Sequence, residues 1–436
     1  MPIRTLLAGA CAGAVLATLA CGPASAAGFL IQEQSVRGAG RAYSGEAADG
    51  GAASLWWNPA AISAGPGKSD VYIGAHYIDI SADIHDAGST IQRPVPGLPV
   101  QPVGGVAAQT DAVKKGVAPN LGASWRVSDQ LAVGLAVNAP FNFTTRYPLN
   151  SWTRYQALKS SLFNVDLQPT VSWKPVPQLA LAAGFDASYM LATLSNALPN
   201  PSPLLPDAGS VLHGHGWDYG WVVGLQYRPE DAVSIGVSYR SRISRSLGGQ
   251  VAVQGLLGPA AAANFTAPAT ANFRTPSILT GAIRWRATPA LTLNAQVQHY
   301  DWSVFDALRV NFAGQTQTTP QNYHNTTTAA VGADYAVSPE LTVRGGVQRD
   351  PTPTPDTGRT ARVPDGSRWV FSGGATVAPT PGVAVDVAAT YLAFDTSPIN
   401  SSATAFAGTP LNTPINMLGT VTGHGWILSA GLRFNY

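Results

Sequence analysis

Short turns rich in proline and aspartate alternate with long polar loops along this chain. The short connections include Ser128-Asp129, Thr288-Pro289 and Ser338-Pro339-Glu340. The long loops fall near residues 81–117, 142–160, 195–214, 248–270, 304–322, 351–366 and 396–422. Transmembrane β-barrels have short turns on the periplasmic side and long loops outside, whereas a soluble sandwich has no reason to lengthen every second loop. The alternation of short turns and long loops therefore predicts a β-barrel in an outer membrane.

The segments between the turns have the two-residue period of β-strands. Residues 131–138 place leucine and valine on one face and alanine, glycine or asparagine on the other, and residues 426–436 behave in the same way. Each segment runs about ten residues, which suffices for a tilted strand to cross a bilayer. The expected strands are 70–80, 118–127, 130–140, 161–173, 178–194, 215–228, 232–247, 272–287, 290–303, 323–337, 340–349, 367–378, 383–394 and 423–436. They predict an all-β fold, a transmembrane antiparallel β-barrel of about 14 strands over residues 68–436.

The composition agrees with a lipid-facing surface. Only 11% of the 436 residues are charged and the formal net charge is +2, whereas a soluble domain carries roughly 25% charged residues. After the N-terminus no stretch is long and apolar enough for a membrane helix. Aromatic residues near the strand ends, among them Trp125, Trp173, Trp285 and Tyr300, are typical of interfacial girdles. No basic cluster indicates nucleic-acid binding.

Residues 1–26 have the pattern of a signal peptide. Arg4 supplies the positive charge, Leu6 to Ala20 the apolar core, and Ala24-Ser25-Ala26 the small-residue cleavage site. The alternative is a lipoprotein signal with Cys21 acylated. Cys11 and Cys21 both lie in the segment to be removed, so we expect no disulfide and no thiolate metal site in the mature chain.

Residues 27–67 lack the strand pattern. Phe29, Leu30, Trp56 and Trp57 are too apolar for a solvated tail, and a segment of this size cannot form its own core. A short helix is expected between Ala47 and Trp57. The remaining place for the segment is inside the barrel, where it would act as a hatch.

At this point the chain resembles a known family. The motifs that carry the resemblance are Ala27-Gly28-Phe29, Gly40 to Glu46, Asn58-Pro59-Ala60, Asn138-Ala139-Pro140-Phe141, Pro364 to Arg368 and Phe434-Asn435-Tyr436. They occur in order over nearly the whole mature chain. Together they are similar to the FadL family of outer-membrane channels for long-chain fatty acids and, in some members, aromatic hydrocarbons.

The resemblance implies a mechanism. A fourteen-stranded barrel is closed by an N-terminal hatch, ligand is caught at the outer loops, and it leaves sideways through a gap made by a kinked strand. Transport is passive, with no cofactor. The resemblance also implies a monomer in the outer membrane of a Gram-negative bacterium, surrounded by lipid and lipopolysaccharide, with a hydrophobic small molecule as ligand.

Three sets of candidate residues follow. Phe29 and Arg368 are expected to bind ligand, with Arg368 holding an anionic head group. An alternative for Arg368 is a salt bridge, for example with Asp365. The motif Asn58, Pro59 and Ala60 is expected to tie the hatch.

The resemblance implies that Asn138, Ala139 and Pro140 form the lateral opening. A proline inside a ladder removes a donor and bends the strand, so a break is expected here. The alternative is that the strand simply ends at Asn138. The family usually has glycine after the aromatic residue of this motif, and here Asn142 stands in its place.

Other functions are less well supported. A general diffusion porin should carry opposed rows of charge in its lumen, which these strands do not offer, and an outer-membrane lipid-acting enzyme lacks a Gly-x-Ser-x-Gly elbow. His213 and His215 have no third ligand at a recognisable spacing and are expected to be loop residues. We therefore predict no enzyme, no catalytic residue and no metal.

Overall fold

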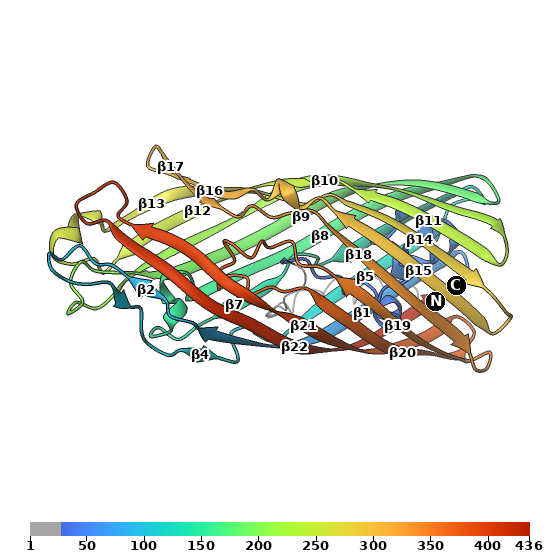
Figure 1. The fold of residues 1–436 in the computed structure, drawn as a ribbon. Helices are drawn as coiled ribbons and strands as arrows, with labels where there is room; N and C mark the ends of the chain where they lie inside the picture. The colour runs from blue at the N-terminus through green and yellow to red at the C-terminus, as the bar shows by residue number, and fades with distance from the viewer. Residues whose placement is uncertain (1–27) are drawn as a thin grey trace, which may run out of the picture.

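The structure, a computed structural model, describes residues 28–436. The expected signal peptide with Cys11 and Cys21 lies outside these residues. The described chain forms a closed antiparallel barrel with fourteen wall positions (Figure 1). The barrel closes where β1 pairs with β22, from Asp70↔Asn435 to Asp86↔Gly419.

Some of the fourteen wall strands are broken into two segments that lie end to end, so the sheet contains more segments than wall strands. The wall consists of β1 (Ser69–Asp86), β5 (Gly116–Arg126), β6 (Leu131–Asn138) with β7 (Phe143–Arg146), β8 (Lys159–Val176), β9 (Leu179–Leu198), β10 (Ala208–Glu230), β11 (Val233–Arg240) with β12 (Ile243–Gln254), β13 (Phe265–Thr275) with β14 (Ile278–Arg286), β15 (Leu291–Tyr300) with β16 (Ala307–Phe312), β18 (Thr326–Ala336), β19 (Leu341–Asp350), β20 (Arg368–Thr380), β21 (Val383–Ala405) and β22 (Thr413–Asn435).

The loops add β2 (Thr90–Ile91), β3 (Gln101–Pro102), β4 (Ala108–Gln109), β17 (Gln315–Pro320), η4 (Trp152–Tyr155), η5 (Gly258–Ala263) and η6 (Trp302–Val304). None of the helices in residues 28–436 has the length and apolar character needed to cross a membrane.

All fourteen expected strands are present, but several are longer than their sequence pattern indicated. β1 continues to Asp86, β10 begins at Ala208, and β21 and β22 pair as far out as Ala405↔Thr413. The predicted loops 81–117, 195–214 and 396–422 are therefore partly strand. The outer ends of these strands form ladder pairs although their sequences lack the alternating apolar pattern on which the prediction rested.

The two faces of the wall are as predicted for a barrel in lipid. On β6, Leu135 is 43% exposed while Ala136 is 2% exposed, and on β22 Trp426 points out while Ile427 is buried. Trp125, Trp173 and Trp285 are exposed, as girdle residues are. Tyr300 is the exception, because it points inward and its hydroxyl accepts a hydrogen bond from Gln32 Nε2 at 3.2 Å.

Residues 28–67 lie inside the barrel as a series of short turns (Figure 1). They form α2 (Val36–Ala39), η1 (Glu46–Ala48), η2 (Ala52–Ser54) and η3 (Pro59–Ala64). The single helix expected between Ala47 and Trp57 is wrong: Gly50 and Gly51 interrupt it, and Gly51 has a φ of 95° that a helix does not allow.

Candidate functional site

An apolar cavity lies inside the barrel above the N-terminal segment. Its wall is mostly aromatic and aliphatic and includes Phe29, Phe143, Leu162, Leu247, Phe273 and Phe305. Phe29 packs edge-on against Phe305 at a ring separation of 5.3 Å and against Trp302 at 5.0 Å. Phe29, which was predicted to bind ligand, thus lies in the wall of a cavity suited to a hydrocarbon.

One cation lines this cavity, and it is Arg362, in the loop between β19 and β20. Its guanidinium donates to Asn196 Oδ1 at 2.9 Å and to the Ser195 carbonyl at 3.4 Å. Within residues 28–436, no carboxylate forms an ion pair with it. Burial lowers the pKa of Arg362 to about 10, because an apolar environment disfavours the charged form.

Arg368 lies elsewhere. It is 2% exposed, does not line the cavity, and pairs with Asp350 at 2.7 Å. The alternative of a salt bridge is present, although its main partner is Asp350 rather than Asp365. Asp365 instead accepts a hydrogen bond from the Gly28 N–H at 2.8 Å, and burial raises the pKa of this carboxyl to about 6. A head-group role for Arg368 stays a prediction.

The barrel wall is interrupted between β5 and the β6–β7 pair. β5 pairs with β6 from Arg126↔Ala132 only as far as Leu121↔Val137, and residues 116–120 pair with β1 alone on the other side. Pairing returns further out as the isolated bridge Val113↔Thr145. Proline occurs on both sides of this gap, as Pro119 and Pro140, and neither can donate to a ladder.

The predicted strand 130–140 therefore ends at Asn138, two residues early, and resumes as β7 at Phe143. Both parts pair with β8, but the register moves by one residue between Asn138↔Asp166 and Phe143↔Leu162. The Asn142 side chain repairs the broken ladder: its Oδ1 accepts from Asn164 N at 2.7 Å and its Nδ2 donates to Asn164 O at 3.2 Å. Asn142 thus holds the kink without unpaired backbone on the β8 side.

The N-terminal segment covers the gap from inside. Ile31 N donates to Pro140 O at 2.7 Å, Asn138 Nδ2 to Gln34 Oε1 at 2.9 Å and Asn120 Nδ2 to Glu33 O at 3.0 Å. These contacts lie directly after Phe29, which lines the cavity. Residues 31–34 therefore stand between the cavity and the gap.

The motif Asn58-Pro59-Ala60 joins the segment to the wall. Asn58 Oδ1 accepts from Ala60 N at 3.0 Å, while its Nδ2 donates to Ala47 O at 2.7 Å and to Leu225 O of β10 at 2.9 Å. A side chain at Gly224 would come within 2.0 Å of Asn58 Oδ1, so this close approach requires glycine. The asparagine is fully buried and all these bonds are within the protein.

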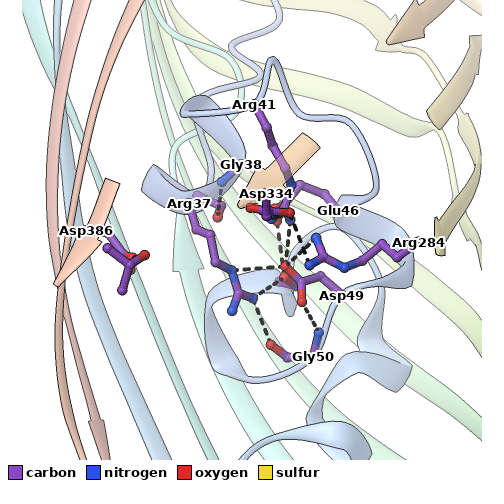
Figure 2. Close-up of polar contacts among 12 residues, drawn as sticks. Arg37, Gly38, Arg41, Glu46, Asp49, Gly50, Arg284, Asp334 and Asp386 are labelled. Atoms are coloured by element: carbon purple, nitrogen blue, oxygen red, sulfur yellow. Dashed lines mark hydrogen bonds and ion pairs between the residues drawn. The ribbon is translucent and has the colours of Figure 1, made fainter. Parts of the chain in front are cut away.

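A buried ion cluster makes a second attachment, with Asp49 at its centre (Figure 2). Asp49 Oδ2 lies 3.0 Å from Arg37 Nε, 2.6 Å from Arg41 Nη2 and 3.3 Å from Arg284 Nη1 of β14. Arg284 and Arg41 also reach Asp334 of β18. Burial alone would raise the pKa of Asp49, but the three arginines outweigh it and hold that pKa well below its usual range.

Metal ligands do not gather anywhere in residues 28–436: no three His, Cys, Asp or Glu side chains form a suitable group. His213 and His215 lie on β10 and not in a loop as expected. His213 contacts Thr193 Oγ1 at 3.1 Å.

Two functional candidates were missed at the sequence level. Arg362 precedes the recognised motif by two residues, and only its position against the cavity distinguishes it from the other loop arginines. Pro119 carried a usable signal, because a proline inside a strand pattern marks an edge or a break.

The geometry agrees with the family that the sequence motifs resemble. The family described as outer membrane protein transport protein (OMPP1/FadL/TodX) matches residues 17–436, so the chain belongs to this family. A long-chain fatty acid transport protein of Escherichia coli O6:H1 is 25% identical over 414 residues, covering 87% of this chain and 90% of the relative. A 47 kDa outer membrane protein of Pasteurella multocida is 27% identical over 413 residues, with 89% and 91% covered.

Solved structures share the fold. A Pseudomonas aeruginosa FadL homologue superposes with a TM-score of 0.82 at 22% identity, covering 94% of this chain and all of that one. The Ralstonia pickettii toluene transporter TbuX gives 0.64 at 17% identity, with 92% and 98% covered. The protein is thus an outer-membrane transporter of a Gram-negative bacterium, a barrel channel for hydrophobic molecules, as the sequence predicted.

Proposed function

We propose that this channel admits amphiphilic carboxylic acids of the long-chain fatty acid kind and releases them sideways into the membrane. The observation that carries the proposal is Arg362, a cation without an ion-pair partner in residues 28–436, on the wall of an otherwise apolar cavity. A pure hydrocarbon has no group that could accept a hydrogen bond from this guanidinium. A carboxylate would receive charge-assisted hydrogen bonds from it while the acyl chain lies among the phenylalanines.

The route out runs past the N-terminal segment. Ligand in the cavity contacts Phe29, and displacement of residues 31–34 uncovers the gap at Asn138, Ala139 and Pro140. The three hydrogen bonds that hold these residues at the gap are single, exchangeable contacts, so ligand binding can compete with them. The movement is driven by diffusion down a concentration gradient and needs no cofactor, metal or nucleic acid.

The names of the relatives are compatible with two ligand classes. One relative is named as a fatty acid transporter, and several structural neighbours are named as toluene or monoaromatic hydrocarbon channels. Arg362 favours the acid for this chain. We further propose that the protein works as a monomer among lipid and lipopolysaccharide and is not an enzyme, since family members are transporters.

A general diffusion porin is the weaker alternative. Residues 28–67 contact wall strands on several sides of the lumen, including β10, β14 and β18, and would obstruct water and ions. A porin predicts high conductance from the intact protein, whereas the proposed channel predicts almost none.

The test compares oleate with its uncharged methyl ester. Arg362→Met keeps the apolar stem and removes the charge, and should weaken oleate binding by about 1.5–3 kcal/mol, the range for a hydrogen bond to a charged group. Methyl oleate binding should be unchanged. Arg349→Met, at a partly exposed arginine away from the cavity, is the control. Equal losses for both ligands would remove the head-group role and with it the preference for acids.

A further inference from the structure

A second interruption of the wall lies between β13 and the connection from β15 to β16. β13 pairs with β16 only from Ala269↔Phe312 to Asn272↔Arg309, and β14 pairs with β15 from Ile278↔Tyr300 onward. Between these ladders, residues 273–275 of β13 have no ladder partner on this side. The opposite segment, residues 301–306, contains η6 and joins β13–β14 through Asp301 N to Ser277 O at 3.0 Å.

Two spaces meet at this interruption. The apolar cavity reaches it from inside through Ala271, Phe273, Phe305 and Leu308. A separate cleft of about 370 Å³ lies against Asn272, Phe273, Arg274, Asp306 and Arg309. Phe273 borders both spaces, and its ring packs edge-on against Phe305 at 5.8 Å. One pair of aromatic rings thus marks the boundary between cleft and cavity.

The cleft is basic. Arg274 is exposed and forms no ion pair within residues 28–436, while Arg309 pairs with Asp306 at 2.5 Å. Arg245 also lines the cleft. It is 2% exposed, and its Nε and Nη2 have no hydrogen-bond partner in the described part of the chain. Its Nη1 donates to Ser188 Oγ at 2.7 Å, and the carboxylates of Asp166, Asp218 and Asp186 already act on it. The exposed Arg274 is therefore the cation of the cleft that is available to an anion.

The height of the cleft on the barrel suits an amphiphile. β10 and β12 stop pairing at His215↔Gly248, and the next outward side chains on β10, Trp217 and Tyr219, are 50% and 62% exposed. Exposed aromatic residues of this kind mark the outer edge of the apolar band. An amphiphile at this edge places its head group in the polar layer and its chain toward the hydrocarbon.

We propose that this cleft is a side entrance for the anionic amphiphile, distinct from the gap at Pro140 and resting on the proposed function. The carboxylate is attracted by Arg274, and the chain passes between Phe273 and Phe305 into the cavity. The head group then transfers to Arg362. Entrance and exit thereby lie at different interruptions of one wall.

Stopped-flow fluorescence with an anthroyloxy-labelled stearate tests this on the full-length protein in detergent. Arg274→Glu should slow association about tenfold at low salt, because it replaces electrostatic attraction with repulsion, and should leave dissociation unchanged. The labelled methyl ester should associate at the wild-type rate. Arg228→Glu is the matched control, because Arg228 is exposed near the other end of β10 and, like Arg274, forms no ion pair within residues 28–436. Phe273→Ala removes the ring between the two spaces and should speed both association and dissociation.

The outcomes separate the two proposals. If wild type and Arg274→Glu associate at equal rates while Arg362→Met still loses oleate affinity, the side entrance is wrong and the proposed function stands. If the wild type binds no labelled acid, both fail. If Arg274→Glu loses co-purifying lipopolysaccharide but associates with the acid normally, the cleft holds a lipid phosphate and the side entrance is overturned.

Discussion

Arg362, in the loop after β19, and Arg368, at the start of β20, differ in what surrounds them. Arg368 has Asp350 at 2.7 Å, and Asp350 also accepts from Thr328 Oγ1 at 2.7 Å. Arg362 has an amide, a hydroxyl and a carbonyl as neighbours but no carboxylate among the described residues. A paired arginine is neutralised, whereas an arginine bound only by neutral groups still attracts an anion.

Arg368→Met should therefore act on stability. It leaves the Asp350 carboxylate buried without its cation, which costs about 3–5 kcal/mol, and urea unfolding in lipid vesicles should show the loss. Adding Asp350→Asn removes the uncompensated charge and should restore most of it. If the double variant is stable yet has lost oleate binding and kept methyl oleate binding, Arg368 holds the head group after all.

At the scale of strands, the interruption between β6 and β7 is maintained by a proline that cannot donate a hydrogen bond and by a side chain that bonds the free backbone. Pro140 supplies no N–H, the register on β8 moves by one residue, and Asn142 bonds the backbone of Asn164 in place of the missing ladder. Unpaired backbone in a membrane wall costs several kcal/mol per group, so a kink persists only where side chains satisfy it.

Deletion of Pro140 should close this gap. Removing one residue brings β6 and β7 into one register against β8, and Phe143 keeps its inward direction. The barrel should still assemble and bind oleate, since Phe143 keeps its place in the cavity wall, but uptake of labelled oleate by cells should fall at least tenfold. Heat-modifiable mobility on gels checks folding. Wild-type uptake by a folded deletion variant would show that ligand does not leave here.

At the scale of the whole molecule, the barrel and the N-terminal segment form one interior. Asn58 bonds β10, and Asp49 and Arg41 join β14 and β18. The depressed pKa of Asp49 fixes the sign of its pH dependence. Its contribution is fully present above the unfolded pKa of about 4 and is lost as pH falls through the lower folded value. The attachment should thus be constant from about pH 5 to 8.

Asp49→Asn should loosen the segment at neutral pH. Arg37, Arg41 and Arg284 then lose their shared carboxylate, and we expect transient ion-conducting openings in planar bilayers where the wild type stays closed. Deletion of residues 29–60 is the positive control and should conduct steadily. Asp395→Asn, at an exposed ion pair, should remain closed. A closed Asp49→Asn channel beside a conducting deletion would mean that the cluster does not hold the segment.

The patterns along the chain predicted the barrel, its fourteen strands and its outer-membrane location, and the motifs predicted the family. Both patterns, the two-residue alternation and the alternating loop length, can be detected along the chain. The alternation arises because one face of every strand contacts lipid, and the loop lengths alternate because successive loops lie on opposite sides of the membrane. Phe29 and the break near Pro140 were detectable as an apolar residue in an otherwise unpatterned segment and a proline in a strand pattern, whereas the Asn58 motif came from the family resemblance.

The folded structure was needed to show which arginine lines the cavity, that Asn142 bonds the backbone at the broken ladder, and that β13 and β15–β16 leave a second interruption. Each of these depends on partners far apart in the chain, such as Arg362 with Asn196 and Asn142 with Asn164. A pattern along the chain records burial and turns, but it does not record which groups meet across the lumen.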